Sequence, residues 1–119
     1  MEIRERMVGA ITVLEPVGTL VLTEGQSDAQ LRDLITGLMS QGRRHFMVDL
    51  RQVTQADSAG LSMLVSAQIA VARRGGLIKF LNPTKRLREL FWITKLNMFF
   101  EVFEKEQDAI QSFSARLDS

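Results

Sequence analysis

The chain contains no cysteine and a single histidine, His45. Without cysteine, neither a disulfide framework nor a thiolate metal site can form. With one histidine, a transition-metal site would depend on scattered carboxylates. His45 also precedes a strand expected over residues 46–50, about 17 Å in length, whose far end leads to Ser58, so a Ser–His catalytic pair is out of reach. Since no phosphate loop or nucleophile elbow occurs either, we predict no enzyme and no metal site.

The chain also lacks an excess of charge and a long apolar run. It has 15 basic and 14 acidic residues, a balance that argues against direct nucleic-acid binding. The longest stretch without charge, Ser58 to Ala72, is too short and polar to span a bilayer. The mixed-charge start, Met1 to Arg6, carries no signal-peptide core. These features predict one cytoplasmic domain over residues 1–119 without a membrane segment.

Apolar patterns predict the order of the secondary structure. Strands are expected over residues 10–14, 17–22, 46–50, 77–81 and 99–103, with the first two separated by Glu15-Pro16, a bulge or turn at Gly18, and the last at a sheet edge. Helices are expected after Ser27 (a cap paired with Gln30) up to Gly42, from Ser58 to Arg74, from Pro83 with Asn82 as its cap, and around Ala109, Ile110 and Phe113. Alternating strands and helices predict an α/β fold with a mostly parallel or mixed sheet of four to five strands and about four helices.

The segment Asp57-Ser58-Ala59-Gly60 stands where a strand pattern gives way to a helix pattern. Ligands and partners of open parallel sheets gather at the carboxyl ends of strands. Ser58 is either the helix cap, a common role for serine, or a functional hydroxyl. If Asp57 is the cap instead, Ser58 occupies the first helical position with its hydroxyl outward. The local residues leave both interpretations open.

The predicted helix after Ser58 has an expected inward stripe of Leu61, Leu64, Val65 and Ala72. Met63 is then a candidate exposed apolar contact. In the rest of the chain, the arginine pairs 43–44 and 73–74 and the cluster 85–88 are interpreted as solvated surface. Phe91 and Trp92 are interpreted as core or rim.

Several segments together resemble a STAS domain of the single-domain bacterial anti-sigma factor antagonist type. They are Val48-Asp49-Leu50, Val53-Thr54, Asp57-Ser58-Ala59-Gly60-Leu61, Gly75-Gly76, Leu81-Asn82 and the phenylalanine strand. The similarity extends from about Ile11 to Phe113.

The resemblance implies partner switching. In that family the unphosphorylated protein binds an anti-sigma factor that is also a serine kinase of the histidine-kinase-like ATPase type. The kinase phosphorylates the serine after the motif aspartate, here Ser58, and a PP2C-type phosphatase restores binding. The implied partner-binding residues are Asp57, Ala59, Gly60, Leu61, Ser62 and Met63. ATP binds to the kinase in that family, so the resemblance implies no cofactor on this chain.

One position departs from the family pattern. An aspartate usually follows Gly-x-Leu, whereas here Val21 follows Gly18-Thr19-Leu20, and Glu24 is the nearby acid. The identity of the kinase therefore stays open. The alternative function is a STAS interaction subunit of a stressosome, transporter or lipid-transport assembly with no phosphorylation cycle.

Overall fold

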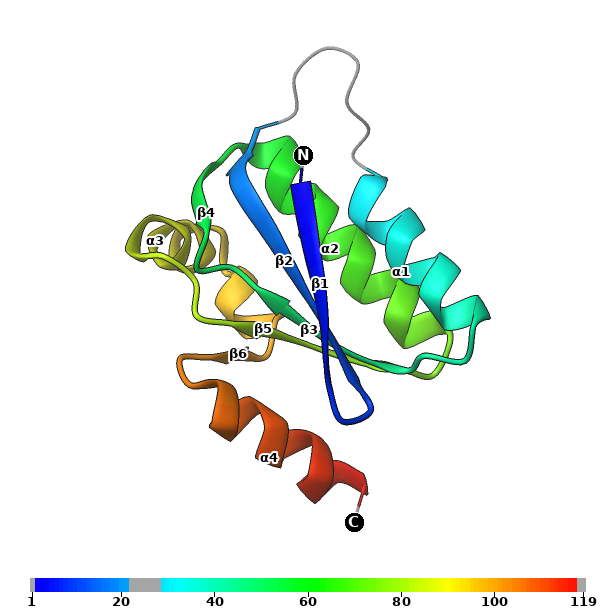
Figure 1. Ribbon diagram of the computed structural model, residues 1–119. Helices are drawn as coiled ribbons and strands as arrows, with labels where there is room; N and C mark the ends of the chain where they lie inside the picture. Colours follow the sequence, from blue (N-terminus) through cyan, green and yellow to red (C-terminus); the bar gives the residue numbers. More distant parts are fainter. Residues whose placement is uncertain (1, 22–28, 118–119) are drawn as a thin grey trace.

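The computed structural model describes residues 2–21 and 29–117, which form a mixed sheet with helices on both faces (Figure 1). The strands are β1 (Glu2–Val8), β2 (Ile11–Leu20), β3 (His45–Asp49), β4 (Val53–Ala56), β5 (Leu77–Leu81) and β6 (Val102–Phe103). The helices are α1 (Gln30–Ser40), α2 (Ser58–Arg73), α3 (Lys85–Thr94) and α4 (Glu106–Leu117), with a 3-10 turn η1 (Leu96–Met98). The α/β class with four helices is confirmed.

The sheet has the strand order β1-β2-β3-β5-β6, and β4 pairs with the far part of β2. Only the β1–β2 pair is antiparallel. We did not predict β1 from its mixed charges. Because β1 lies at the sheet edge and is almost wholly exposed, its sequence needs no apolar face.

Strand β2 runs unbroken through Glu15-Pro16, so the expected division into two strands is wrong. Its pairing with β3 ends at Leu14, and its pairing with β4 begins at Gly18. Pro16 therefore lies where no parallel neighbour needs its missing N–H. The pairing register shifts after Gly18, whose φ is 108°, which confirms the predicted irregularity there.

Strand β4 is a second element missing from the prediction. It has only four residues, of which Val53 and Ala56 are buried and the two between them exposed. A run this short carries too little alternation to be recognised. As a consequence, Ser58 follows β4 rather than the end of β3.

The predicted cap Ser27 of the first helix lies outside the described residues, as does Glu24. The predicted end of that helix is confirmed, because Gly42 follows the last turn with φ 96°. The third helix begins later than expected: Thr84 is its cap, and Asn82 adopts φ 54° before it.

The last strand is confirmed at the edge, but it spans only Val102–Phe103. Phe99 and Phe100 instead follow η1. Phe100 is buried, with its ring centroid 4.3 Å from that of Phe80 and 5.3 Å from that of Phe91. Packing of this aromatic cluster therefore takes the chain out of the sheet at this point.

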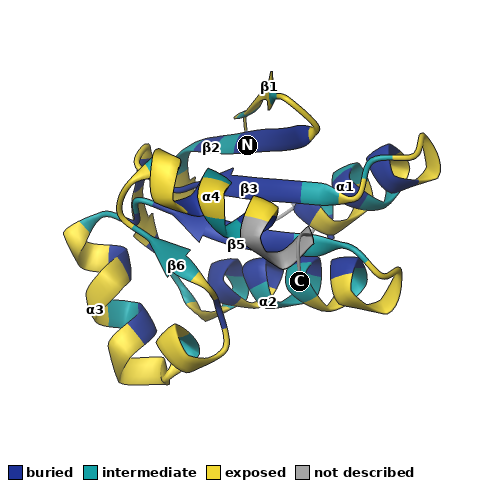
Figure 2. Ribbon diagram, turned by 90° about the horizontal axis from the view of Figure 1, so that it is seen from below, coloured by how far each residue is buried: buried dark blue, intermediate teal, exposed yellow. Residues whose placement is uncertain are grey.

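The main core lies between the sheet and helices α1 and α2, while α4 covers the other face over a smaller core (Figures 1 and 2). Helix α2 buries Leu61 and Leu64 as expected, but Ala72 is exposed and Val71 is buried in its place. Phe91 is buried and Trp92 is not. No helix in the described part of the chain is long and apolar enough to cross a bilayer.

Candidate functional site at the start of helix α2

Asp57 is the cap of helix α2. Its carboxylate Oδ1 accepts a hydrogen bond from the Gly60 amide at 2.8 Å, and its carbonyl accepts from the Leu61 amide at 3.0 Å. Its own amide donates to the Leu20 carbonyl at 3.3 Å. These bonds attach the first turn of α2 to the end of β2, so this junction is held by Asp57 and backbone groups alone.

Gly60 allows α2 to approach β2 this closely. A Cβ at this position would lie 1.7 Å from the Leu20 carbonyl oxygen, which is backbone and cannot turn aside. Gly60, which the resemblance implies as a partner-binding residue, is therefore buried against β2. Its role is to let two backbones touch.

Ser58 occupies the first helical position and is exposed. Its hydroxyl makes no hydrogen bond to any of the described residues. Since Asp57 does the capping, the first of the two open interpretations, a structural cap serine, is excluded. The structure therefore assigns no structural role to this hydroxyl. It lies at the N-terminus of α2, where the first backbone amides have no partner within the helix.

The other predicted site residues are divided by burial. Ser62, one turn further along α2, is exposed, and Ala59 is half-buried. Leu61 is buried against the core. Met63 is fully buried, so its expected exposure is wrong. Helical spacing places position 63 beside Ala67 and over the core, a direction that the interrupted apolar pattern of α2 did not reveal.

A groove of about 460 Å³ between α1 and α2 begins at Ser62. Arg32 from α1 and Arg73 from α2 line it, and the Arg32 Nη1 group donates to the Ser66 Oγ at 3.3 Å. This groove could not be predicted from the sequence, because Arg32 and Arg73 line it together only once the two helices pack. The groove adds positive charge next to the Ser58 surface.

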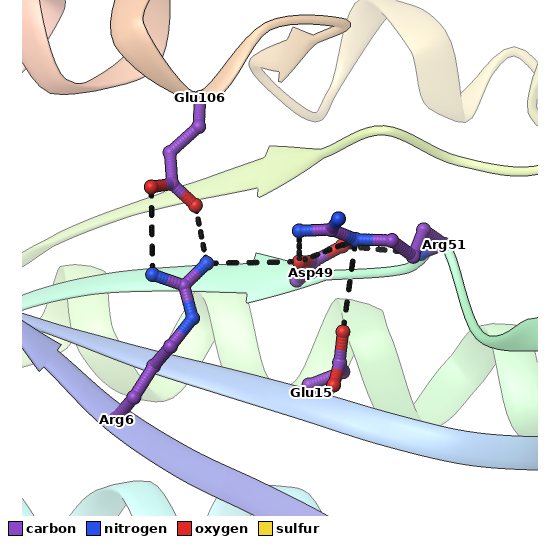
Figure 3. Close-up of polar contacts among 5 residues, drawn as sticks. All are labelled: Arg6, Glu15, Asp49, Arg51 and Glu106. Carbon is purple, nitrogen blue, oxygen red and sulfur yellow. Dashed lines mark hydrogen bonds and ion pairs between the residues drawn. The ribbon is translucent and has the colours of Figure 1, made fainter.

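A second polar cluster lies on the other side of the sheet (Figure 3). Asp49 is fully buried, and its Oδ2 accepts from Arg51 Nη2 at 2.7 Å. Arg6 contacts Asp49 at 3.8 Å and forms a hydrogen-bonded ion pair with Glu106, and Arg51 contacts Glu15 at 3.7 Å. Hydrogen bonding to Asp49 raises the pKa of Arg51, and hydrogen bonding to Glu106 raises that of Arg6. The cluster is fully paired, and we assign it the structural task of joining β1, β2, β3 and α4.

Lys79 and His45 lie near the same face. Lys79 is buried, forms an ion pair with Glu101, and places its ammonium 5.1 Å from the centroid of the Phe113 ring. His45 packs against the same ring, and burial lowers the pKa of His45, with a smaller contribution from the charge of Lys79. Among the described residues, no group of three or more acidic or histidine side chains could hold a metal ion.

Comparison with known proteins adds to this geometry. The family model described as "Mlab, STAS domain" matches residues 17–101. The anti-sigma-B factor antagonist of Bacillus subtilis (strain 168) is 32% identical over 81 residues, which cover 68% of this chain and 73% of that protein.

Solved structures show the same fold. A Thermotoga maritima protein crystallised as a candidate anti-sigma factor antagonist superimposes with a TM-score of 0.80, at 15% identity over 92% of each chain. The anti-sigma factor antagonist SpoIIAA of Bacillus matches in its unphosphorylated form with a TM-score of 0.68, at 19% identity over 95% of this chain and 98% of that one. Its phosphorylated form gives 0.68, at 20% identity over 94% and 99%. With a family model covering most of its length and a sheet and helices arranged as in these structures, the chain belongs to the STAS domain family.

Proposed function

We propose that this protein is an anti-sigma factor antagonist that binds its partner when Ser58 is unphosphorylated and releases it when Ser58 is phosphorylated. One observation carries the proposal. The Ser58 hydroxyl is exposed and unbonded among the described residues, while Asp57 alone caps α2. A hydroxyl that no structural bond requires can be modified without disturbing the fold.

Two relatives support the proposal. The Bacillus subtilis relative is named an anti-sigma-B factor antagonist, and SpoIIAA, which shares the fold, has been solved with and without phosphate. The STAS motif residues Asp57 and Ser58 lie at the start of α2, where Asp57 is the cap and the Ser58 hydroxyl takes no part in capping.

The electrostatics of the site explain how phosphorylation would act. A phosphoryl group adds a charge of about −1.5 to −2 next to the Asp57 carboxylate. The amides and dipole of the α2 N-terminus offset part of that charge, so the domain stays folded. A partner surface docked over Ser58 would have to bury it unpaired, at a cost of several kcal/mol. A loss of about 2.7 kcal/mol already lowers affinity a hundredfold.

The proposed partners are those that the resemblance to anti-sigma factor antagonists implies. The Ser58 oxygen receives the γ-phosphoryl group of ATP from a kinase partner, ADP leaves, and the hydroxyl proton is released. We propose that the kinase is the anti-sigma factor itself, of the histidine-kinase-like ATPase type, and that a PP2C-type phosphatase reverses the step. This chain then needs no cofactor of its own and no catalytic residue.

The contact surface is proposed to centre on Ser58. Asp57, Ala59 and Ser62 surround it, and the groove with Arg32 and Arg73 continues it. Gly60 and Leu61 act from below by fixing the backbone. Val21 lies where the family usually has an aspartate, so the kinase cannot contact a carboxylate at this position. We therefore propose a kinase whose surface accepts an apolar residue there.

A second candidate function is a STAS subunit of a larger assembly that is never phosphorylated. One observation favours this candidate. The matching family model is described as "Mlab, STAS domain", and the description does not mention an antagonist. The two candidates share the surface around Ser58 and differ in whether a phosphoryl group ever reaches it.

Intact mass spectrometry after incubation with ATP and the candidate kinase distinguishes them. We expect a gain of one phosphoryl group in the wild type and in Ser62→Ala, and no gain in Ser58→Ala. Ser62 is the matched control because it is exposed on the same helix one turn away.

Modification of Ser58→Ala, or of Ser62 in preference to Ser58, would contradict the proposed site. A wild type that stays unmodified and does not bind the anti-sigma factor would favour the second candidate, whereas binding without modification would contradict the phosphorylation switch.

A further inference from the structure

A surface of exposed apolar side chains lies on α3 and η1, elements that the Ser58 site does not use. Its members are Trp92, 73% exposed, Ile93, 71%, Met98, 83%, and Phe99, 44%. We call these four residues the α3 surface. Figure 2 shows α3 and the turn after it as mostly exposed. Isolated apolar residues on a surface are ordinary, but four of this size in one short segment indicate a contact.

The α3 surface adjoins a groove of about 900 Å³. Trp92 and Ile93 form part of its wall, and Phe91 and Val102 supply further apolar area. The same molecule therefore offers projecting side chains and a hollow next to them. In a dimer with a twofold axis, the projecting side chains of each copy can fill the groove of the other copy.

The charges at the groove point to the same occupant. Its charged lining residues are two basic, Lys85 and Arg88, and two acidic, Glu89 and Glu104. A strongly acidic or basic partner, or an anionic lipid surface, would meet as much repulsion as attraction there. A second copy turned by a twofold axis can set opposite signs against each other.

The available area fits a weak dimer. Large aromatic side chains bury about 150–250 Å² each, so the four residues together offer on the order of 500 Å². A stable interface needs about 800 Å² from each partner. The α3 surface supplies most of this area, and the charged residues around the groove supply the remainder.

We propose that the α3 surface is the contact between two copies of this chain, with Trp92 and Ile93 of each copy seated at the groove of the other. The contact goes beyond the proposed function of Ser58 and does not depend on it. Because the Ser58 site is built on α2, a dimer formed through α3 presents two such sites (Figure 1).

Sedimentation velocity and light scattering across about 10 μM to 1 mM protein test the proposal. The wild type should shift from monomer to dimer, with a dissociation constant inside this concentration range. Trp92 is the only tryptophan of the chain, so its emission should move to shorter wavelength over the same range. Ile93→Glu should weaken the dimer at least tenfold, whereas the matched control Ile69→Glu, on α2, should leave it unchanged.

Charge reversal provides a second test. Neither Lys85 nor Glu89 has an ion-pair partner among the described residues, so either can be reversed without breaking a bond in the monomer. Lys85→Glu makes the groove charges predominantly acidic, and Glu89→Lys makes them predominantly basic. Each variant alone should stay monomeric, while an equimolar mixture should form a heterodimer with wild-type affinity or better.

Circular dichroism establishes that each variant is folded before it is compared. A wild type that stays monomeric at 1 mM would overturn the proposal, as would a dimer that Ile93→Glu and Ile69→Glu weaken equally. Flotation of the monomer with neutral lipid vesicles, lost in Ile93→Glu, would overturn it in favour of a membrane contact.

Discussion

Helices α2 and α3 both begin with a side-chain cap, yet their exposed surfaces have opposite chemistry. Asp57 caps α2 and Thr84 caps α3, each by accepting a hydrogen bond from the amide three residues later. Helix α2 begins in direct backbone contact with β2 and exposes a hydroxyl. Helix α3 exposes an indole and a branched aliphatic chain instead. A side-chain cap therefore begins both helices, but the exposed surface is polar on α2 and apolar on α3.

The two surfaces differ because the two helices pack differently against the rest of the domain. At α2 the missing side chain of Gly60 lets the first turn approach the Leu20 backbone, and the hydrogen bonds of Asp57 hold that turn in place. A rigid site suits a switch, because one added charge then acts at a defined point. At α3 large side chains remain outside the core, which suits a contact driven by burial of apolar area.

The largest expected effect tests the close approach at α2. Gly60→Ala should destabilise the domain by about 3 kcal/mol or more, because the new Cβ would overlap the Leu20 carbonyl and force α2 away from the sheet. Gly37→Ala, in α1, is the matched control. It meets nothing within 4 Å and should be neutral or stabilising by up to about 1 kcal/mol. Urea unfolding measures both, and equal effects would show that the contact with β2 does not matter.

Loss of either cap should lower the stability of the domain by a similar amount, but only loss of the Asp57 cap should weaken partner binding. Asp57→Ala and Thr84→Ala should each destabilise the domain by about 1 kcal/mol. Thr84 also donates to the Val53 carbonyl at 3.0 Å, so its loss can be somewhat greater. Only Asp57→Ala should weaken binding of the anti-sigma factor, measured by calorimetry. Equal weakening by both variants would place the partner over α3 as well.

The smallest effect concerns the face covered by α4, which belongs to neither surface. Because the pKa of His45 is lowered in the folded state, the unfolded chain binds the proton more readily. The contribution of His45 to stability is therefore complete above its ordinary pKa, near 6.5, and is lost as the pH falls through and below that value.

His45→Gln removes this proton from the balance. Unfolding in urea at pH 7.5 and at pH 5.5 should show a smaller loss of stability in the variant than in the wild type. Identical losses in the two proteins would show that His45 titrates in the same way in both states. Neither the affinity of the Ser58 surface nor dimerisation should change in this variant at pH 7.5.

The sequence predicts the fold where apolar runs are long, and it fails where pairing or packing decides. The helix from Ser58 and the strand at Leu77–Leu81 follow from their patterns. Strand β1 escapes prediction because an edge strand can be charged throughout, and β4 because four residues carry no readable period. The continuity of β2 through Pro16 depends on which neighbours it pairs with there.

The position of Asp57 and Ser58 at the start of a helix could be predicted from the sequence, but their geometry only in part. The motif left open whether Ser58 or Asp57 caps the helix, and the structure resolves this through the hydrogen bond that the Gly60 amide donates to Asp57 Oδ1. The burial of Met63 was not predicted because the expected inward stripe ran through Val65 and Ala72, whereas the buried face of α2 includes Met63, Ala67 and Val71. The Gln68 side-chain amide donates to the Phe99 carbonyl at 2.7 Å, which joins α2 to the end of η1.

The most direct measurement is the affinity of the anti-sigma factor for the wild type and for Ser58→Asp, with Ser114→Asp, an exposed serine on α4, as the charge-matched control. We expect unchanged circular dichroism in all three, wild-type affinity for Ser114→Asp, and at least a hundredfold loss for Ser58→Asp. Unaltered binding by a folded Ser58→Asp protein, or a loss that appears only because this variant unfolds, would contradict a switch based on local charge.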